Sequence, residues 1–232
     1  MEIDLDSRFV TYEVKRSAKA KFARLELDLR RGVWVTLPSA APISDAEDLI
    51  RLKSEWLLRH LTKLDRLRSV VPVRRLVTGD RLPYLDGTLV LDVTTGAAWV
   101  ERRGETLAVS LPNPNERMTR LLLEEWYTDE AEEQLARLAV ETAGRHGIPI
   151  RGVRVSRAKT RWGSCSSTGW INLNWRLMLA PTRIVDYLVA HELAHVAHKN
   201  HSSAFWSRVA ELHPAYAESE RWLRKFGAGL VL

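Results

Sequence analysis

His191-Glu192-Leu193-Ala194-His195 lies within residues 183–198, where apolar side chains recur at helical spacing. Pro181 precedes this segment, and proline suits the start of a helix because its missing N–H needs no partner there. The pattern therefore predicts a buried helix that carries both histidines. Residues four apart project from the same helical face, one turn apart, so the two imidazoles can reach a common point.

This spacing of imidazoles is typical of a helix that binds zinc. Glu192 follows the first histidine, where a carboxylate can take a proton from a metal-activated water and later give it to a leaving amine. We therefore predict zinc as the cofactor, His191 and His195 as metal ligands, and Glu192 as general acid/base. Without a metal, a buried glutamate between two histidines would be costly.

A catalytic zinc usually has three protein ligands, so a third residue is needed. His201 is the first choice, because Asn200 tolerates the backbone conformation that ends a helix and lets the chain turn back. His198 is less suitable, since in a continuous helix it lies about 10 Å along the axis from His191. Downstream acids are the remaining alternative: Glu211, Glu218 and Glu220.

Two strands are predicted before this helix, over residues 153–165 and 170–178, joined by a turn at 166–169. In the second run, apolar residues alternate with Asn172 and Asn174, as in a strand with one face on the core. We interpret this run as an edge strand near the metal that pairs with an extended substrate; a plain sheet strand with solvated polar residues is the alternative.

The remainder of the chain predicts an α+β protein. Residues 8–37 and 73–111 show the alternation of strands, with one turn at Arg31-Gly32. Ser44 and Glu47 form a capping box that predicts an amphipathic helix over about 44–69. A long helix is predicted over 116–145, and no internal repeat is visible. These patterns place a β-rich region at 1–112 and a second domain at 113–232.

Several motifs together carry a family resemblance. They are Arg161-Trp162-Gly163-Ser164-Cys165, the helical motif at 191–195, Asn200-His201-Ser202 and Phe205-Trp206. The chain resembles the YgjP-like metallopeptidases, which are similar to the SprT-like and WLM zinc proteases. In those proteases the third ligand is a histidine six positions after the second motif histidine, which here is His201. The resemblance implies a zincin-like, minigluzincin-type domain over 113–232, with a short sheet packed on the metal-binding helix, that hydrolyses peptides or proteins.

Composition limits the cellular setting. The 232 residues are 45% hydrophobic with one cysteine, Cys165, which cannot form an internal disulfide. The first ten residues lack the features of a signal peptide, and no apolar run reaches the roughly 18 residues of a membrane span. We expect a cytoplasmic protein without a membrane partner, in which Cys165 is a small buried residue rather than a nucleophile or ligand.

The net charge of +6 leaves other functions open. The densest basic cluster near the motif is Arg151, Arg154, Arg157, Lys159 and Arg161, which suits a nucleotide or nucleic acid, an acidic peptide, or a merely solvated strand. One alternative function is therefore metal-dependent hydrolysis of a nucleotide phosphoanhydride. Another is a zinc-binding adaptor without catalysis, although a structural zinc site has no need of Glu192.

Overall fold

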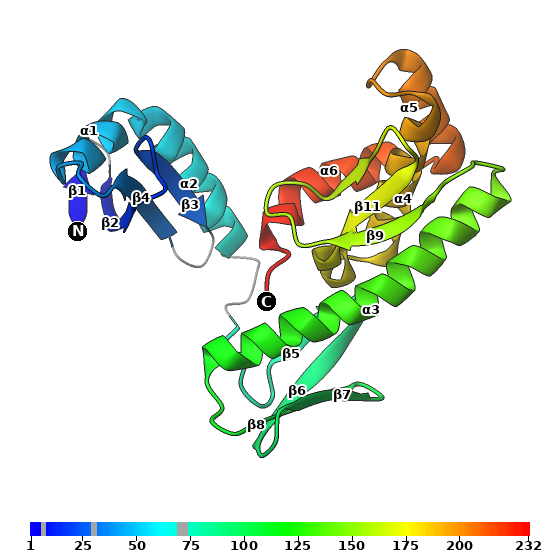
Figure 1. Cartoon of the computed structure of the whole chain (residues 1–232), viewed down its shortest axis with the longest axis horizontal. Helices are drawn as coiled ribbons and strands as arrows, with labels where there is room; N and C mark the ends of the chain where they lie inside the picture. The colour runs from blue at the N-terminus through cyan, green and yellow to red at the C-terminus, as the bar shows by residue number, and fades with distance from the viewer. Residues whose placement is uncertain (6–7, 29–31, 69–73) are drawn as a thin grey trace. The chain divides into compact units, whose positions relative to one another are not determined.

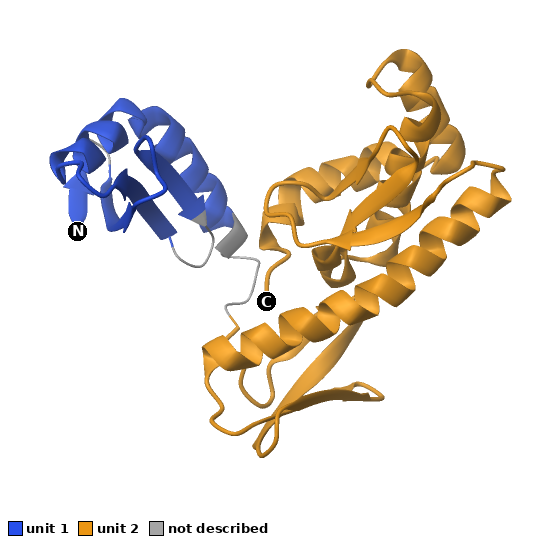
Figure 2. Cartoon of the chain, viewed as in Figure 1, with its two compact units in different colours: residues 1–73 blue, residues 74–232 orange. Residues whose placement is uncertain are grey.

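The computed structural model describes residues 1–5, 8–28, 32–68 and 74–232. It divides into two compact units, residues 1–73 and 74–232 (Figure 2). The described residues form three small sheets and six α-helices, which confirms the mixed α+β class. Arg31 of the predicted turn and the predicted helix end at Ser69 lie outside the described residues. None of the described helices combines the length and apolarity needed to cross a membrane.

The amino-terminal unit is a four-stranded sheet packed on two helices. Its strands have the order β1-β2-β4-β3, and its elements are β1 (Glu2–Asp4), β2 (Phe9–Ser17), β3 (Arg24–Asp28), β4 (Gly32–Pro38), α1 (Ser44–Leu52) and α2 (Ser54–Arg68). Alternate residues of β4 are buried against the helices, as the alternation predicted. The single helix predicted over about 44–69 is instead two, because Lys53 has a ψ of 16° and interrupts the first helix.

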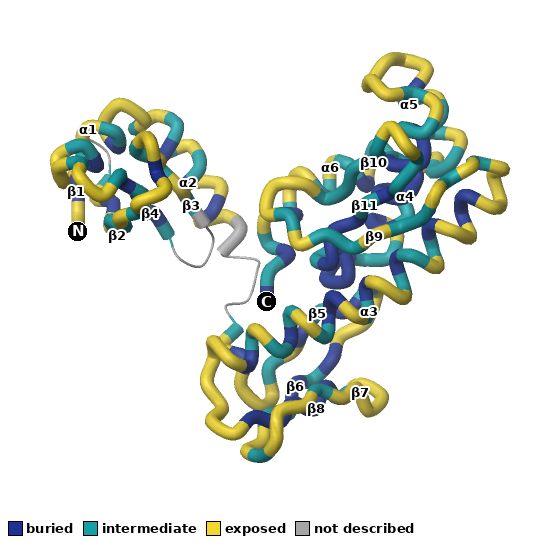
Figure 3. The backbone as a smooth tube through the Cα atoms, in the orientation of Figure 1, coloured by how far each residue is buried: buried dark blue, intermediate teal, exposed yellow. Residues whose placement is uncertain are grey.

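The second unit joins two sheets through one long helix. Its elements are β5 (Arg81–Tyr84), β6 (Gly87–Thr95), β7 (Trp99–Arg103), β8 (Thr106–Leu111), α3 (Glu116–Arg145), β9 (Gly152–Ser156), β10 (Gly163–Cys165), β11 (Trp170–Asn174), the 3₁₀ helices η1 (Trp175–Leu179) and η2 (Gly227–Gly229), α4 (Thr182–Ala197), α5 (Ser203–Leu212) and α6 (Tyr216–Phe226). Helix α3 begins and ends where it was predicted, and runs beside both sheets (Figure 1). One buried core spans both sheets, α3 and α4 (Figure 3).

The division between units differs from the predicted boundary at residues 112 and 113. Strands β5–β8 belong with the unit that carries the histidine motif, because their side chains share its core. The turn between β5 and β6 also forms two hydrogen bonds with residues that precede or begin α4. The Leu85 N–H donates to the Met178 carbonyl at 2.8 Å, and Asp86 Oδ1 accepts from the Thr182 N–H at 3.0 Å. Contacts between residues far apart in sequence therefore set the division.

Asp86 caps the helix that carries the histidines. Pro181, at the N-cap position of α4, has no side-chain acceptor to offer, and the hydrogen bond from Thr182 lowers the pKa of Asp86. We expect Asp86→Ala to lower the free energy of unfolding by about 1 kcal/mol, measured by urea denaturation, because the first turn of α4 loses its acceptor. Asp86→Asn keeps an acceptor oxygen and should lose much less. An equal loss in both variants would contradict the capping role.

The two four-stranded sheets repeat one another. Each has two antiparallel outer pairs around a parallel central pair, in the orders β1-β2-β4-β3 and β5-β6-β8-β7, and each is followed by a helix. When Val35 is matched to Val109, all three registers coincide: Ile3–Val10 with Leu82–Leu89, Val14–Val35 with Val93–Val109, and Leu25–Val35 with Val100–Val109. The sequence does not show this repeat. Two pairs of strands can share a register when both alternate apolar and polar residues, even if the residues themselves differ.

The third sheet has the strand order β10-β11-β9, which corrects three predictions. The run over 153–165 is two strands, β9 and β10, rather than one. Strand β11 lies in the centre, so it is not an edge strand and its backbone is already paired on both sides. It also ends at Asn174 rather than at residue 178, where η1 has begun. Asn174 is fully buried, and its Nδ2 donates to the carbonyls of Ala158 and Arg161 at 2.7 and 2.9 Å. This polar residue holds the loop 157–162 instead of facing solvent.

Candidate metal centre

Helix α4 places the first two histidines one turn apart, as predicted. The ring centroids of His191 and His195 lie 5.0 Å apart. Most of the neighbouring residues on α4 are buried. The helix ends at Ala197, and His198 follows in an extended conformation, with φ −119° and ψ 99°. The chain therefore leaves the helical path before His201, which frees that residue to turn back.

The backbone of His198 fixes the orientation of the second imidazole. Its carbonyl oxygen lies 2.9 Å from Nδ1 of His195, which is the geometry of a hydrogen bond donated by that nitrogen. A proton on Nδ1 leaves Nε2 with a free lone pair. A backbone carbonyl commonly orients a metal-binding histidine in this way. His198 thus contributes through its main chain, and its imidazole is not part of the histidine cluster.

His201 completes a group of three. Its Nε2 lies 3.2 Å from Nε2 of His191, and the ligand atoms of His191, His195 and His201 all lie within 4.8 Å of one another. Two nitrogens bound to one tetrahedral zinc at about 2.0–2.1 Å would be about 3.3 Å apart. Among the described residues these three histidines form the only group of at least three potential metal ligands.

The competing acids have other partners or positions. Glu211 accepts a charged hydrogen bond from Arg208 at 2.8 Å, and Glu220 pairs with Arg224 at 2.6 Å. Glu218 lies in the first turn of α6. None of the three belongs to the group of ligand atoms around His191. The geometry thus favours His201 over each alternative.

The electrostatics of the site suit a cation. Burial, and then the neighbouring charges of His195 and His201, lower the pKa of His191 to about 4. Burial also lowers the pKa of His195. At neutral pH both imidazoles therefore keep the lone pairs that a metal requires. Three imidazole nitrogen donors fit a divalent ion of intermediate softness, so the donor set matches the predicted metal.

Phe205 supports the three imidazoles from one side. Its ring is fully buried, and its centroid lies 4.9, 4.5 and 4.7 Å from those of His191, His195 and His201. Phe205 follows Ser202, whose hydroxyl accepts from its N–H at 3.5 Å and caps α5. The sequence motif contains Phe205 but indicates no role for it. The sequence signals for this role are its aromatic side chain and its place four residues after His201.

Glu192 is buried beside the histidines. Its side chain is 4% exposed, and burial raises its pKa to about 8. Among the described residues, the buried side-chain polar atoms that lack a hydrogen bond are Oε2 of Glu192 and Nδ1 of His191. Unsatisfied buried polar atoms are uncommon and often mark functional sites. His191 offers its Nε2 to the histidine cluster, so Oε2 of Glu192 is the unpaired atom that supports a site completed by a ligand.

A family model for a YgjP-like, metallopeptidase domain matches residues 21–226. The chain belongs to the YgjP-like metallopeptidase family. Among solved structures, the metallopeptidase zymogen of Pyrococcus abyssi abylysin is similar to part of the chain. The match has 25% sequence identity and a TM-score of 0.36, and covers 40% of this chain and 96% of that one. No curated protein matches the sequence.

Gly163 positions the carboxylate in this YgjP-like domain. A Cβ atom at Gly163 would lie 2.8 Å from both Cγ and Cδ of Glu192 and still closer to its Oε1, so only glycine leaves room here. Gly163 pairs with Leu173 in the sheet, so β10 is the strand that contacts the carboxylate. The sequence motif contained Gly163 but gave no indication of this contact.

We expect Gly163→Ala to lower kcat/KM by about 100-fold, because the added methyl group displaces Glu192 from its position. Metal content, measured by plasma mass spectrometry, should remain at the wild-type level, since no ligand is touched. Gly144→Ala on α3 is the matched control, because a Cβ there meets no atom within 4 Å. Wild-type activity in Gly163→Ala would show that the carboxylate does not depend on this contact.

Two other residues of the sequence motif, Cys165 and Trp162, contact residues outside the histidine cluster. Cys165 is half-buried and outside the ligand group, with Lys199 Nζ 3.9 Å from its Sγ, and burial raises the pKa of its thiol. A thiol with a raised pKa is a poor nucleophile at neutral pH. Trp162 packs on Gly227, and the guanidinium of Arg176 lies 5.0 Å from its ring.

Proposed function

We propose that this YgjP-like metallopeptidase is a zinc enzyme that hydrolyses peptide bonds, with His191, His195 and His201 as the metal ligands. The observation that carries the proposal is the convergence of three imidazole nitrogens next to one buried carboxylate. Bound zinc lowers the pKa of a water ligand and polarises a carbonyl group, which supplies both the nucleophile and the electrophile for hydrolysis. The remaining steps belong to residues of this chain.

Glu192 is proposed as the general acid/base. Its unpaired Oε2 is available to accept a proton from the attacking water. Burial raises the pKa of Glu192 in the metal-free protein, and a nearby cation would lower it, so the carboxylate form that accepts the proton would be present with the metal bound. The protonated carboxyl can then donate to the nitrogen of the leaving amine. Because Gly163 fixes the far side of the carboxylate, Glu192 is held in place during both transfers.

An extended substrate is proposed to pair with β10. This strand lies at one end of the order β10-β11-β9, so its outer backbone groups are not used by the sheet. Gly163 of β10 also touches Glu192, which brings that free edge to the reacting carboxylate. Pairing of a peptide with an exposed sheet edge gives affinity through main-chain hydrogen bonds. This replaces β11, the strand that the sequence had suggested for the role.

The geometry does not favour nucleotide hydrolysis at this site. Successive residues of a strand face opposite sides of the sheet, so Ser164 points away from the side on which Gly163 touches Glu192. The cations that motivated this alternative include Arg154, which pairs with Asn172 on the same outward side as Ser164. An adaptor role is not favoured either, since it needs no buried carboxylate beside the metal. A cytoplasmic location is part of the proposal, because a chain with one cysteine needs no oxidising compartment.

The test is mass spectrometry of two mixed pools after incubation with the zinc-loaded enzyme. One pool contains unfolded proteins and the other nucleoside triphosphates. We expect new peptides and intact nucleotides. Cleaved nucleotides with intact proteins would contradict the proposal and favour phosphoanhydride hydrolysis. Omission of the metal should prevent peptide formation, because the imidazoles alone cannot activate water to the same extent.

A further inference from the structure

The net positive charge of this protein comes from one segment, which contains no acidic residue. Residues 142–185 contain eight of the 35 lysines and arginines and none of the 29 aspartates and glutamates. The eight are Arg145, Arg151, Arg154, Arg157, Lys159, Arg161, Arg176 and Arg183. The rest of the chain is therefore slightly acidic. A basic segment within an otherwise acidic chain indicates a local role for the charge rather than a general effect on solubility.

Part of this segment forms the third sheet. Its outer face consists of Arg154 and Ser156 on β9, Trp170 and Asn172 on β11, and Ser164 on β10. Asn172 pairs with Arg154 on one side and with Ser164 on the other, so these three lie in one row across the strands. All five residues are at least partly exposed. The outer face is polar and accessible, unlike the inner face with Ile171 and Leu173.

Arg154 is held in place without an acidic partner. Its guanidinium lies 3.8 Å from the centroid of the Trp170 ring, and that ring lies close to Gly152, where a Cβ would be 2.7 Å from it. Among the described residues no carboxylate forms an ion pair with Arg154. Stacking on an aromatic ring fixes a guanidinium but leaves its N–H donors free. Such an arginine is suited to bidentate binding of a phosphate.

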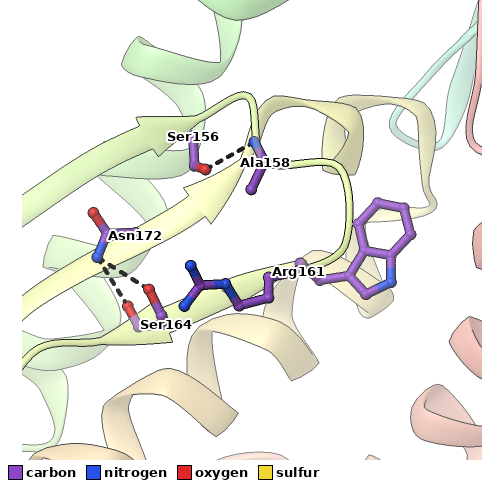
Figure 4. Close-up of a pocket in the computed structure, with 7 residues that line it drawn as sticks. Ser156, Ala158, Arg161, Ser164 and Asn172 are labelled. Carbon is purple, nitrogen blue, oxygen red and sulfur yellow. Dashed lines mark hydrogen bonds between the residues drawn. The ribbon is translucent and has the colours of Figure 1, made fainter. Parts of the chain in front are cut away.

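A pocket lined in part by Ser156, Arg161, Ser164 and Asn172 presents further donors. It has a volume of about 240 Å³, and Arg161 reaches along the strands toward Ser164 and Asn172 (Figure 4). Ser156 Oγ accepts from the Ala158 N–H at 3.1 Å, and Ser164 Oγ accepts from Asn172 Nδ2 at 3.2 Å. Because both hydroxyl oxygens already accept, their hydrogens are available to donate. A pocket with hydroxyl and guanidinium donors favours a ligand that only accepts, as phosphate oxygens do.

We propose that the outer face binds the phosphate backbone of a nucleic acid, with one phosphate in the pocket at Arg161 and another on Arg154. The pocket at Arg161 is lined by Ser156, Asn172 and Ser164 from the three strands, and Arg154 pairs with Asn172 in the same sheet. Two phosphates of one nucleic-acid strand can therefore reach both positions. Arg157 and Lys159 are exposed and lie between Arg154 and Arg161 in the sequence, so they extend the same positive region. The Trp170 ring is covered by Arg154, so recognition rests on phosphates and not on base stacking.

Binding at the outer face is independent of catalysis. The metal centre lies on the other side of β10, since Gly163 faces Glu192 and Ser164 faces outward. A bound nucleic acid would therefore leave the site of peptide hydrolysis free. The protein substrate and the nucleic acid would then both lie at β10, the substrate along its free edge and the phosphate in the pocket that Gly163 and Ser164 line.

The experiment measures fluorescence anisotropy of a labelled oligothymidylate of about 20 nucleotides with the full-length, zinc-loaded protein. We expect affinity to fall between about 50 and about 200 mM salt, because binding releases counterions. Arg154→Gln/Arg161→Gln should weaken binding by about tenfold and reduce the slope of log affinity against log salt by about 1.4, at about 0.7 per lost phosphate contact. Lys159→Gln/Arg161→Gln, which preserves the Trp170 stack, is the second variant if the first does not fold.

The matched control is Arg137→Gln/Arg221→Gln, which removes the same charge from exposed positions on α3 and α6. It should change affinity by less than about twofold. No binding by the wild type, or equal weakening by both double variants, would overturn the proposal. Tighter binding of labelled polyglutamate through the same two arginines would also overturn it, because the outer face would then bind acidic protein. The assay involves no turnover, so either result leaves the proposed peptidase activity untouched.

Discussion

Glu192→Gln is expected to lower kcat/KM for peptide hydrolysis by about a thousandfold, because the amide cannot accept the proton of the attacking water. The substitution keeps the shape of the side chain, so the contact with Gly163 is preserved. It also removes a carboxylate whose burial raises its pKa to about 8, so the folded state should not be destabilised. The loss should therefore be one of chemistry and not of folding.

Three measurements distinguish these effects for Glu192→Gln. Plasma mass spectrometry should find one zinc per chain, since all three histidines are retained. Urea denaturation should give at least the wild-type free energy of unfolding. Peptide hydrolysis, followed by mass spectrometry of an unfolded protein, should be almost absent. Wild-type hydrolysis in this variant would refute the role of Glu192 even if the metal is bound by the three histidines.

The parts of the site that could be predicted from the sequence are those fixed by local periodicity. The helical pattern around His191 placed two imidazoles and Glu192 correctly on α4, because 3.6 residues per turn determines which side chains share a face. The position of His201 was also predictable, since Asn200 follows the end of the helix. Likewise α3 was found at its observed bounds, because its apolar stripe continues through eight turns.

The parts that could not be predicted depend on contacts between distant segments. Alternation identifies a strand but not its neighbours, so β11 was taken for an edge although β9 and β10 flank it. Asn174 was expected at the surface because it is polar, yet it satisfies two buried carbonyls of a loop that precedes it. The contact of Gly163 with Glu192 likewise joins a strand to a helix, and no local pattern contains it.

His201→Ala is expected to weaken zinc binding by more than about 100-fold and to abolish peptide hydrolysis. Loss of a residue that merely orients a ligand already costs about 10–100-fold in affinity, and His201 is proposed to bind the metal directly. Competition with a chromophoric chelator measures the affinity. The residue is exposed and lies outside α4 and α5, so the metal-free variant should unfold at the same urea concentration as the metal-free wild type.

His198→Ala is the matched control, because His198 is three residues away and its contribution is a backbone carbonyl that alanine retains. This variant should keep wild-type zinc affinity, while His201→Ala should not. The opposite order would make His198 the third ligand and would require the chain after Ala197 to adopt another conformation. Equal and small effects in both variants would point to one of the acids, which Glu211→Gln, Glu218→Gln and Glu220→Gln would then identify through loss of metal. The contrast between two neighbouring histidines therefore tests the metal site at the point where the helix ends.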